Sequence, residues 1–183
     1  VTNFLLKAVL RRIMGRVALR AWLVFVAVPV TAAWNAAVAW RVIREARIRA
    51  MGPSAGRALV EALQADGSLT PANAEIALRA VAVMVARKHE LHPNLAALLE
   101  RLALPERPAE VDAADRFLTA IDTTDARSRR GPMAVLLLAT VIDGRLDQSS
   151  VELTLQAATR CGASVQRADL KRLHASFLRG EAI

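Results

Sequence analysis

A run of twenty residues without a charged side chain, residues 21–40, most constrains what this chain can fold into. Its sequence is AWLVFVAVPVTAAWNAAVAW, and as a helix it would rise about 30 Å, the thickness of the hydrocarbon core of a bilayer. Trp22 and Trp40 stand near its two ends, where tryptophans are enriched at membrane interfaces. Such a run is expected to be buried, either in a membrane or in a protein core.

Basic residues border this uncharged run on both sides. The whole net charge of +8 lies in residues 1–50, which contain nine Lys or Arg and one acid, Glu45. The body of the chain contains equal numbers of basic and acidic groups, so a cationic leader precedes a neutral body. This asymmetry indicates an anionic partner for the leader, either phospholipid or nucleic acid. Nucleic acid is disfavoured because the uncharged run splits the basic groups and no aromatic residues are interleaved for base stacking.

Residues 4–19 have the pattern of a basic amphipathic helix. Leu6, Leu10, Ile13 and Val17 follow one apolar stripe, and basic residues occupy the other side. We therefore expect membrane contacts from Lys7, Arg11, Arg12, Arg16, Arg20, Trp22, Phe25, Trp34, Trp40, Arg41 and Arg44. The predicted location is the cytoplasmic face of the inner membrane. The alternative is a cytoplasmic protein in which this segment is buried against the rest of the chain.

Pro29, near the middle of the uncharged run, predicts a hairpin or a kinked helix, because proline removes a backbone donor. A hairpin also suits the charges, since a single span would put five basic residues on one side and four on the other. The run is too long and begins too late for a signal peptide. After Trp40 the helix is expected to continue to Met51 and to stop at Gly52-Pro53. This predicts two domains, residues 1–52 and 53–183.

Behind that boundary the sequence predicts only helices, which makes the fold class all-α. Ala, Leu and Arg dominate the chain, and alternating β-branched runs are absent. Breaks at Gly and Pro predict helices at 54–65, 71–90, 94–103, 109–122, 132–142, 148–161 and 167–179. No nucleophile elbow, phosphate-binding loop or zinc-ligand cluster occurs, so we expect a non-enzymatic protein without a small-molecule substrate.

Two segments of the body look alike, and they predict a duplicated helix-turn-helix unit. ALVEALQADGSLTPANAEIALRAV begins at Ala58, and MAVLLLATVIDGRLDQSSVELTLQAA begins at Met133. Each contains Asp-Gly, a leucine two residues later, a helix-capping residue and a Glu nine positions after the Asp. The glycines would end one helix, the leucines would enter the core, and Thr70 and Asp147 would cap the next helix.

These two turns resemble the TerB-like family of tellurite-resistance proteins over about residues 54–183. A shorter segment, AVPVTAAWNAAVAWRVIREARIRAMG, is similar to the Val-Pro-Val region of EcsC-like proteins. The first resemblance implies a TerB-like helical bundle with a role in tellurite or other stress responses. Together the two would make this chain the C-terminal part of a longer protein.

The TerB-like resemblance also implies a divalent metal held by acids near each turn. Asp66 and Asp143 match the family's first acid, but Asn73 and Ser150 stand where the family usually has a second. A hard cation needs several oxygen ligands, so this departure disfavours a metal cofactor. The candidate metal ligands are Asp66, Asp143, Asp147 and Glu152.

Three functions follow from these patterns. The first is a membrane-associated helical adaptor in bacterial stress response, which binds lipid through its leader and an unknown protein through its body. The second is a metal-binding or metal-sensing TerB-like module. The third is a soluble helical protein-interaction domain with the N-terminal segment buried.

Overall fold

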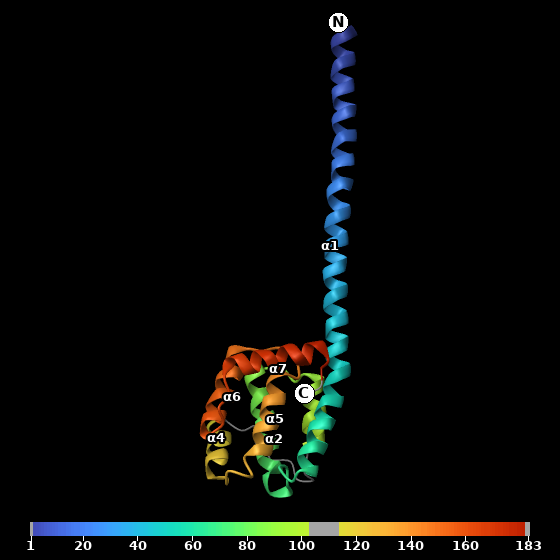
Figure 1. The fold of residues 1–183 in the computed structure, drawn as a ribbon. Helices are drawn as coiled ribbons and strands as arrows, with labels where there is room; N and C mark the ends of the chain where they lie inside the picture. Colours follow the sequence, from blue (N-terminus) through green and yellow to red (C-terminus); the bar gives the residue numbers. More distant parts are fainter. Residues whose placement is uncertain (1, 103–113, 182–183) are drawn as a thin grey trace. The chain divides into compact units, whose positions relative to one another are not determined.

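The computed structural model describes residues 2–102 and 114–181, and within residues 2–24 it describes only the side chains of residues 11–15, 17 and 22. Every regular element in these ranges is an α-helix, which confirms the all-α prediction. The chain divides into two compact units, Val1–Arg44 and Glu45–Ile183. Figure 1 shows α1 (Thr2–Ala65), which contributes to both units, and the shorter helices of the second unit.

The second unit is a helical bundle with α2 and α5 at its centre. After α1 come α2 (Pro71–Lys88), α3 (Pro93–Leu102), α4 (Ala114–Thr123), α5 (Arg130–Val141), α6 (Gln148–Arg160) and α7 (Arg167–Arg179). Helix α2 packs against α3, α4, α5 and α6, whereas α7 packs against α5 and α6. In Figure 1 α7 runs across the direction of α2 and α5. Helix α5 is buried on nearly all sides because its residues are almost all apolar.

The last part of α1 belongs to this core. Ile48, Val60 and Leu63 of α1 are buried, and Met51 and Leu59 pack partly against the same cluster. These positions recur at helical spacing, so one face of α1 between residues 48 and 63 covers the bundle. The structure divides the chain between Arg44 and Glu45, before the predicted boundary at Gly52-Pro53.

Of the two alternatives predicted at Pro29, a hairpin or a kinked helix, the structure excludes the hairpin, because α1 continues as one long helix through Pro29 and through Gly52-Pro53. No glycine occurs between Gly15 and Gly52, so the segment lacks a residue suited to a tight reverse turn. Pro29 removes one backbone donor, and the helix continues on both sides of it. Near this site the Thr31 hydroxyl donates a hydrogen bond of 2.7 Å to the Ala27 carbonyl.

The remaining helices match the predicted ones closely at their starts and ends. Helix α7 has the predicted bounds, whereas α2 ends at Lys88, two residues early, because His89 adopts a left-handed conformation with φ of 51°. The start of the helix predicted at 109–122 lies outside the described residues, and α4 is described from Ala114.

The two predicted turns have the same local geometry. Gly67 and Gly144 have φ of 72° and 71°, a conformation that favours glycine. In each turn the aspartate before the glycine accepts a backbone hydrogen bond, from Ser68 at 2.8 Å for Asp66 and from Arg145 at 3.1 Å for Asp143. Thr70 and Asp147 occupy the N-cap positions of α2 and α6, as predicted. The two turns therefore share a local design, and the TerB-like bundle stays a prediction.

Candidate functional site

The first unit exposes an uncharged apolar helix. The exposed fractions of Trp22, Phe25, Trp34 and Trp40 are 73%, 82%, 70% and 66%. The apolar residues between Phe25 and Trp40 are exposed as well, since a single helix has no core in which to bury them. Contiguous exposed apolar surface of this size marks a site of interaction with protein or membrane.

Within the described part of the chain one helix is long and apolar enough to cross a membrane. The qualifying stretch is Phe25–Ala65, judged by length and composition alone. Its uncharged portion ends at Trp40, where Arg41 and Arg44 begin the cationic flank. The Arg44 guanidinium lies 5.9 Å from the centroid of the Trp40 ring, within range of a cation–π interaction. A tryptophan beside an arginine suits the boundary between hydrocarbon and headgroups.

The predicted basic contacts of the first unit are only partly described. Arg11, Arg12 and Arg41 are exposed. The side chains of Lys7, Arg16 and Arg20 lie outside the described residues.

Glu45, the first residue of the second unit, is held by Arg49 and His92. The hydrogen bond from Arg49 lowers the pKa of Glu45, burial opposes it, and the contact with His92 lowers the pKa further. Its Oε1 lies 2.7 Å from Nε of Arg49 and 3.2 Å from Nε2 of His92. Nδ1 of His92 accepts a hydrogen bond from the backbone of Asn94, so Nε2 carries the proton that faces Glu45 when the ring is neutral. The sequence did not reveal that His92 is buried or that it contacts α1.

Asn94 joins three segments of the second unit. Its buried Nδ2 donates hydrogen bonds of 2.8 Å to the carbonyls of Ile48 in α1 and Ile142 after α5. Gly52 makes this approach possible, because a Cβ at that position would lie 2.0 Å from the same Nδ2. The glycine predicted to stop α1 instead allows close packing against α3.

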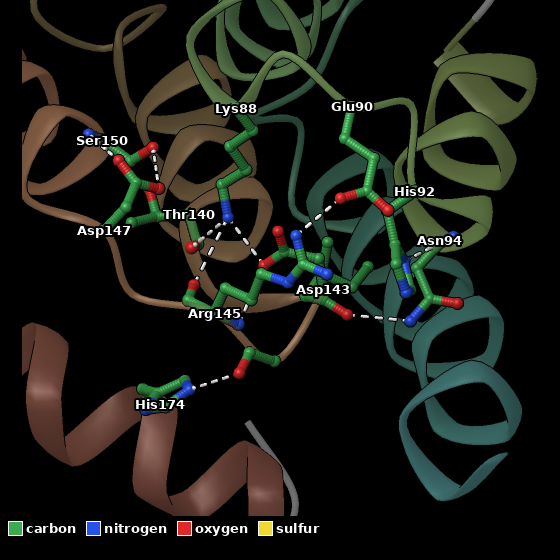
Figure 2. Close-up of polar contacts among 12 residues, drawn as sticks. Lys88, Glu90, His92, Asn94, Thr140, Asp143, Arg145, Asp147, Ser150 and His174 are labelled. Atoms are coloured by element: carbon green, nitrogen blue, oxygen red, sulfur yellow. Dashed lines mark hydrogen bonds and ion pairs between the residues drawn. The ribbon is translucent and has the colours of Figure 1, made fainter. Parts of the chain in front are cut away.

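A buried ion pair joins the end of α2 to the second turn (Figure 2). Nζ of Lys88 lies 2.6 Å from Oδ1 of Asp143, and both side chains are about 5% exposed or less. The same ammonium donates to the carbonyls of Thr140 at 2.9 Å and Arg145 at 3.3 Å. All three donors of Lys88 are therefore used inside the protein.

The predicted metal ligands do not come together. Within residues 2–102 and 114–181 no group of three His, Cys, Asp or Glu side chains could hold a metal ion. Asp143 is paired with Lys88, which occupies the position that a cation would take. Asp66 is exposed and hydrogen-bonded to its own turn, and Glu152 accepts from Gln148 at 2.8 Å. These contacts account for the shared local form of the two turns through capping and packing.

Asp147 is fully engaged as a helix cap. Its Oδ1 accepts from the backbone of Ser150 at 2.8 Å and from the Ser149 hydroxyl, and its Oδ2 accepts from the Ser150 hydroxyl at 2.7 Å. Burial would raise the pKa of Asp147, but the hydrogen bonds from Ser150 and Ser149 outweigh it and lower the pKa overall. The carboxylate form is thus stabilised by the fold.

Replacing Asp147 by alanine is expected to lower the free energy of unfolding by about 1 kcal/mol at pH 7. Because the pKa is lower in the folded state, this contribution is present above the unfolded value of about 4 and is lost as the pH falls through the folded value. Urea unfolding at pH 7 and pH 3 would measure both effects. Glu152→Ala is the control, with an expected change below about 0.5 kcal/mol because its contact is exposed. An equal effect of the two substitutions would contradict the capping role.

An apolar groove of about 550 Å³ lies on the second unit between α1, α5 and α7. Its walls are formed mainly by alanine, leucine, methionine and phenylalanine side chains. Drug-sized ligands occupy pockets of about 300–1,000 Å³. Sequence patterns could not reveal this groove, because three helices far apart in the chain form it.

Comparison of the chain with protein-family models, curated proteins and solved structures found no match in any of the three. The TerB-like and EcsC-like resemblances therefore stay predictions that depend on the short motifs alone.

Proposed function

We propose that this chain is a membrane-associated, non-enzymatic helical adaptor. The carrying observation is the exposed uncharged stretch of the first unit, with tryptophans near both ends and arginines on both flanks. Its lipid partner is a bilayer surface with anionic headgroups, and the second unit presents a separate bundle to a protein partner. The cytoplasmic face of the inner membrane and a role in stress response are parts of this proposal, and the latter rests on the TerB-like resemblance alone.

The energetics of insertion favour the proposal by a narrow margin. Residues 21–40 contain seven Leu, Phe or Val residues, each worth about −0.3 to −0.6 kcal/mol on an insertion scale. Together these residues favour membrane insertion by a few kcal/mol. One aspartate at the centre of a span opposes insertion by about 2.5–3.5 kcal/mol. A single acidic substitution is therefore expected to cancel most of the membrane affinity.

Membrane fractionation of the expressed chain tests whether it binds a membrane and whether one acidic substitution cancels that binding. We expect the full-length protein in the membrane pellet, and Val30→Asp largely in the high-speed supernatant. Leu91→Asp is the matched control, because Leu91 is also an exposed apolar residue but lies in the second unit. A variant that lacks the leader should delete residues 1–44 rather than 1–52, because the second unit needs Ile48 and Gly52. Recovery of the full-length chain wholly in the supernatant without detergent would reject the proposal.

Binding to vesicles separates the role of charge from that of the apolar stretch. All three tryptophans lie in residues 22–40, so their fluorescence reports the first unit alone. We expect a blue shift with phosphatidylglycerol vesicles that is weaker with phosphatidylcholine, because arginines favour anionic headgroups. A gel shift with nucleic acid at low salt, in the absence of any response to vesicles, would favour the nucleic-acid alternative.

A further inference from the structure

The apolar groove of the second unit has walls that suit a hydrocarbon chain. Met51, Ala58 and Leu59 line it from α1, Leu137 from α5, and Leu173 and Phe177 from α7. Its α1 wall runs from Met51 to Leu59 and is about 12 Å long at 1.5 Å per residue. Few polar groups face the groove, so water inside it lacks the partners that hold buried water in place. Filling it with apolar atoms is therefore favourable.

One end of the groove carries an excess of positive charge. Gly180 lies there against Met51 and Arg47: a Cβ built on Gly180 would be 3.0 Å from the sulfur of Met51 and from Nη2 of Arg47. Arg47 is exposed and donates one N–H to the carbonyl of Arg179. A guanidinium has five N–H donors, so it can also bind an anion.

Among the described residues that line the groove, the one acid is already paired with a cation. Glu181 lines the groove, and its carboxylate receives hydrogen bonds from Nε and Nη2 of Arg179 at 2.5 and 2.8 Å. This pairing lowers the pKa of Glu181 to about 2, so it is ionised but matched by Arg179. Among the described residues, the charge of Arg47 is then the surplus at this end of the groove.

We propose that the groove binds the hydrocarbon chain of a single-chain anionic amphiphile, such as a long-chain carboxylate, with its headgroup at Arg47. A molecule with one charged end fits a groove that has apolar walls and one surplus cation at one end. A helix of a partner protein is the competing occupant. This ligand site differs from the expectation that the chain takes no small molecule, and it does not depend on membrane binding by the first unit.

The NMR signals of methionine methyl groups can report binding at the groove, in the core and in the first unit of the full-length chain. The sequence has four methionines: Met51 lines the groove, Met84 and Met133 are in the core, and Met14 is exposed in the first unit. The chain would be labelled with ¹³C-methyl methionine, placed in phosphatidylcholine nanodiscs and titrated with dodecanoate. We expect a saturable shift of the Met51 signal and unchanged Met84 and Met133 signals. A silent Met51 would overturn the ligand site, whereas Met14 reports lipid contact separately.

The specificity of the groove is tested by varying the hydrocarbon chain length and the head charge of the ligand. Affinity at Met51 should rise about fourfold for each added methylene from octanoate to dodecanoate, since each buried methylene contributes about 0.8 kcal/mol. Dodecyltrimethylammonium, with the same chain and a cationic head, should bind more weakly. Equal binding of the two would overturn the anionic headgroup. If an amphipathic helical peptide shifts Met51 and dodecanoate does not, the competing occupant is correct and the proposal fails.

Variants test where the hydrocarbon chain and the charged headgroup of the ligand bind. Ala58→Phe fills the groove and should abolish the Met51 response, whereas Ala163→Phe, at an exposed position after α6, should not. Arg47→Gln should weaken dodecanoate about two- to fivefold, the range for an exposed ion pair, without weakening dodecyltrimethylammonium. Arg57→Gln removes the same charge from an exposed position of α1 and should have no effect. Unchanged Met84 and Met133 signals verify that each variant is folded, and a full response in folded Ala58→Phe would overturn the site.

Discussion

Replacing Lys88 by methionine is expected to lower the free energy of unfolding by about 3–5 kcal/mol. The substitution leaves the carboxylate of Asp143 buried without its cation, and it also removes donors from the carbonyls of Thr140 and Arg145. An unpaired buried charge costs much more than an exposed one because the interior solvates it poorly. Urea unfolding followed by far-ultraviolet circular dichroism would measure the change, since all tryptophans lie in the first unit.

Two further variants show whether burial is the cause. Arg145→Met removes the exposed pair between Arg145 and Glu90, whose side chains are 62% and 52% exposed, and should change stability by less than about 1 kcal/mol. The double variant with Lys88→Met and Asp143→Leu should recover much of the loss, because no buried charge is left unpaired. Equal effects of Lys88→Met and Arg145→Met would contradict the buried pair.

Replacing Gly52 by alanine is expected to lower the free energy of unfolding by about 3 kcal/mol. The added Cβ would lie 2.0–2.6 Å from three atoms of the Asn94 side chain, so the amide must leave its place. Its hydrogen bonds to the carbonyls of Ile48 and Ile142 are then lost from a buried site. Thermal and urea unfolding of the full-length chain would measure this.

Gly56 is the matched control, since it is buried in the same helix one turn later. A Cβ there would make ordinary contacts, at 3.5 Å from Leu98 and 3.9 Å from Ile142. Gly56→Ala should therefore stabilise the protein by about 0.5–1 kcal/mol through helix propensity. If both substitutions stabilise the protein to the same extent, Asn94 does not reach α1 as described.

The helices and their caps were predictable because their signals are local. Asp147 caps α6 because a carboxylate before a helix finds unpaired backbone donors within three residues, whatever lies around it. Gly67 and Gly144 end their helices because each adopts a positive φ. The same reasoning failed at Gly52-Pro53, where a pattern that commonly ends helices lies inside α1.

The features of the candidate site also divide into those that the sequence predicted and those that it did not. The exposed apolar stretch was readable in residues 21–40, because twenty uncharged residues form a signal without any tertiary contact. The four predicted metal ligands came from the TerB-like resemblance, and a motif match does not reveal that Lys88, 55 residues before Asp143, pairs with the Asp143 carboxylate. The groove was equally invisible, since its walls come from three helices.

Periodicity, capping residues and charge along the chain were enough to establish an all-helical protein with a cationic, apolar leader, because these properties depend on neighbours within a turn or two of helix. The packing of distant helices had to decide where α1 joins the core, why Gly52 is a glycine, which partner neutralises Asp143 and where the apolar groove lies. Those outcomes depend on which side chains meet after the chain has folded, and a one-dimensional pattern does not contain those distances.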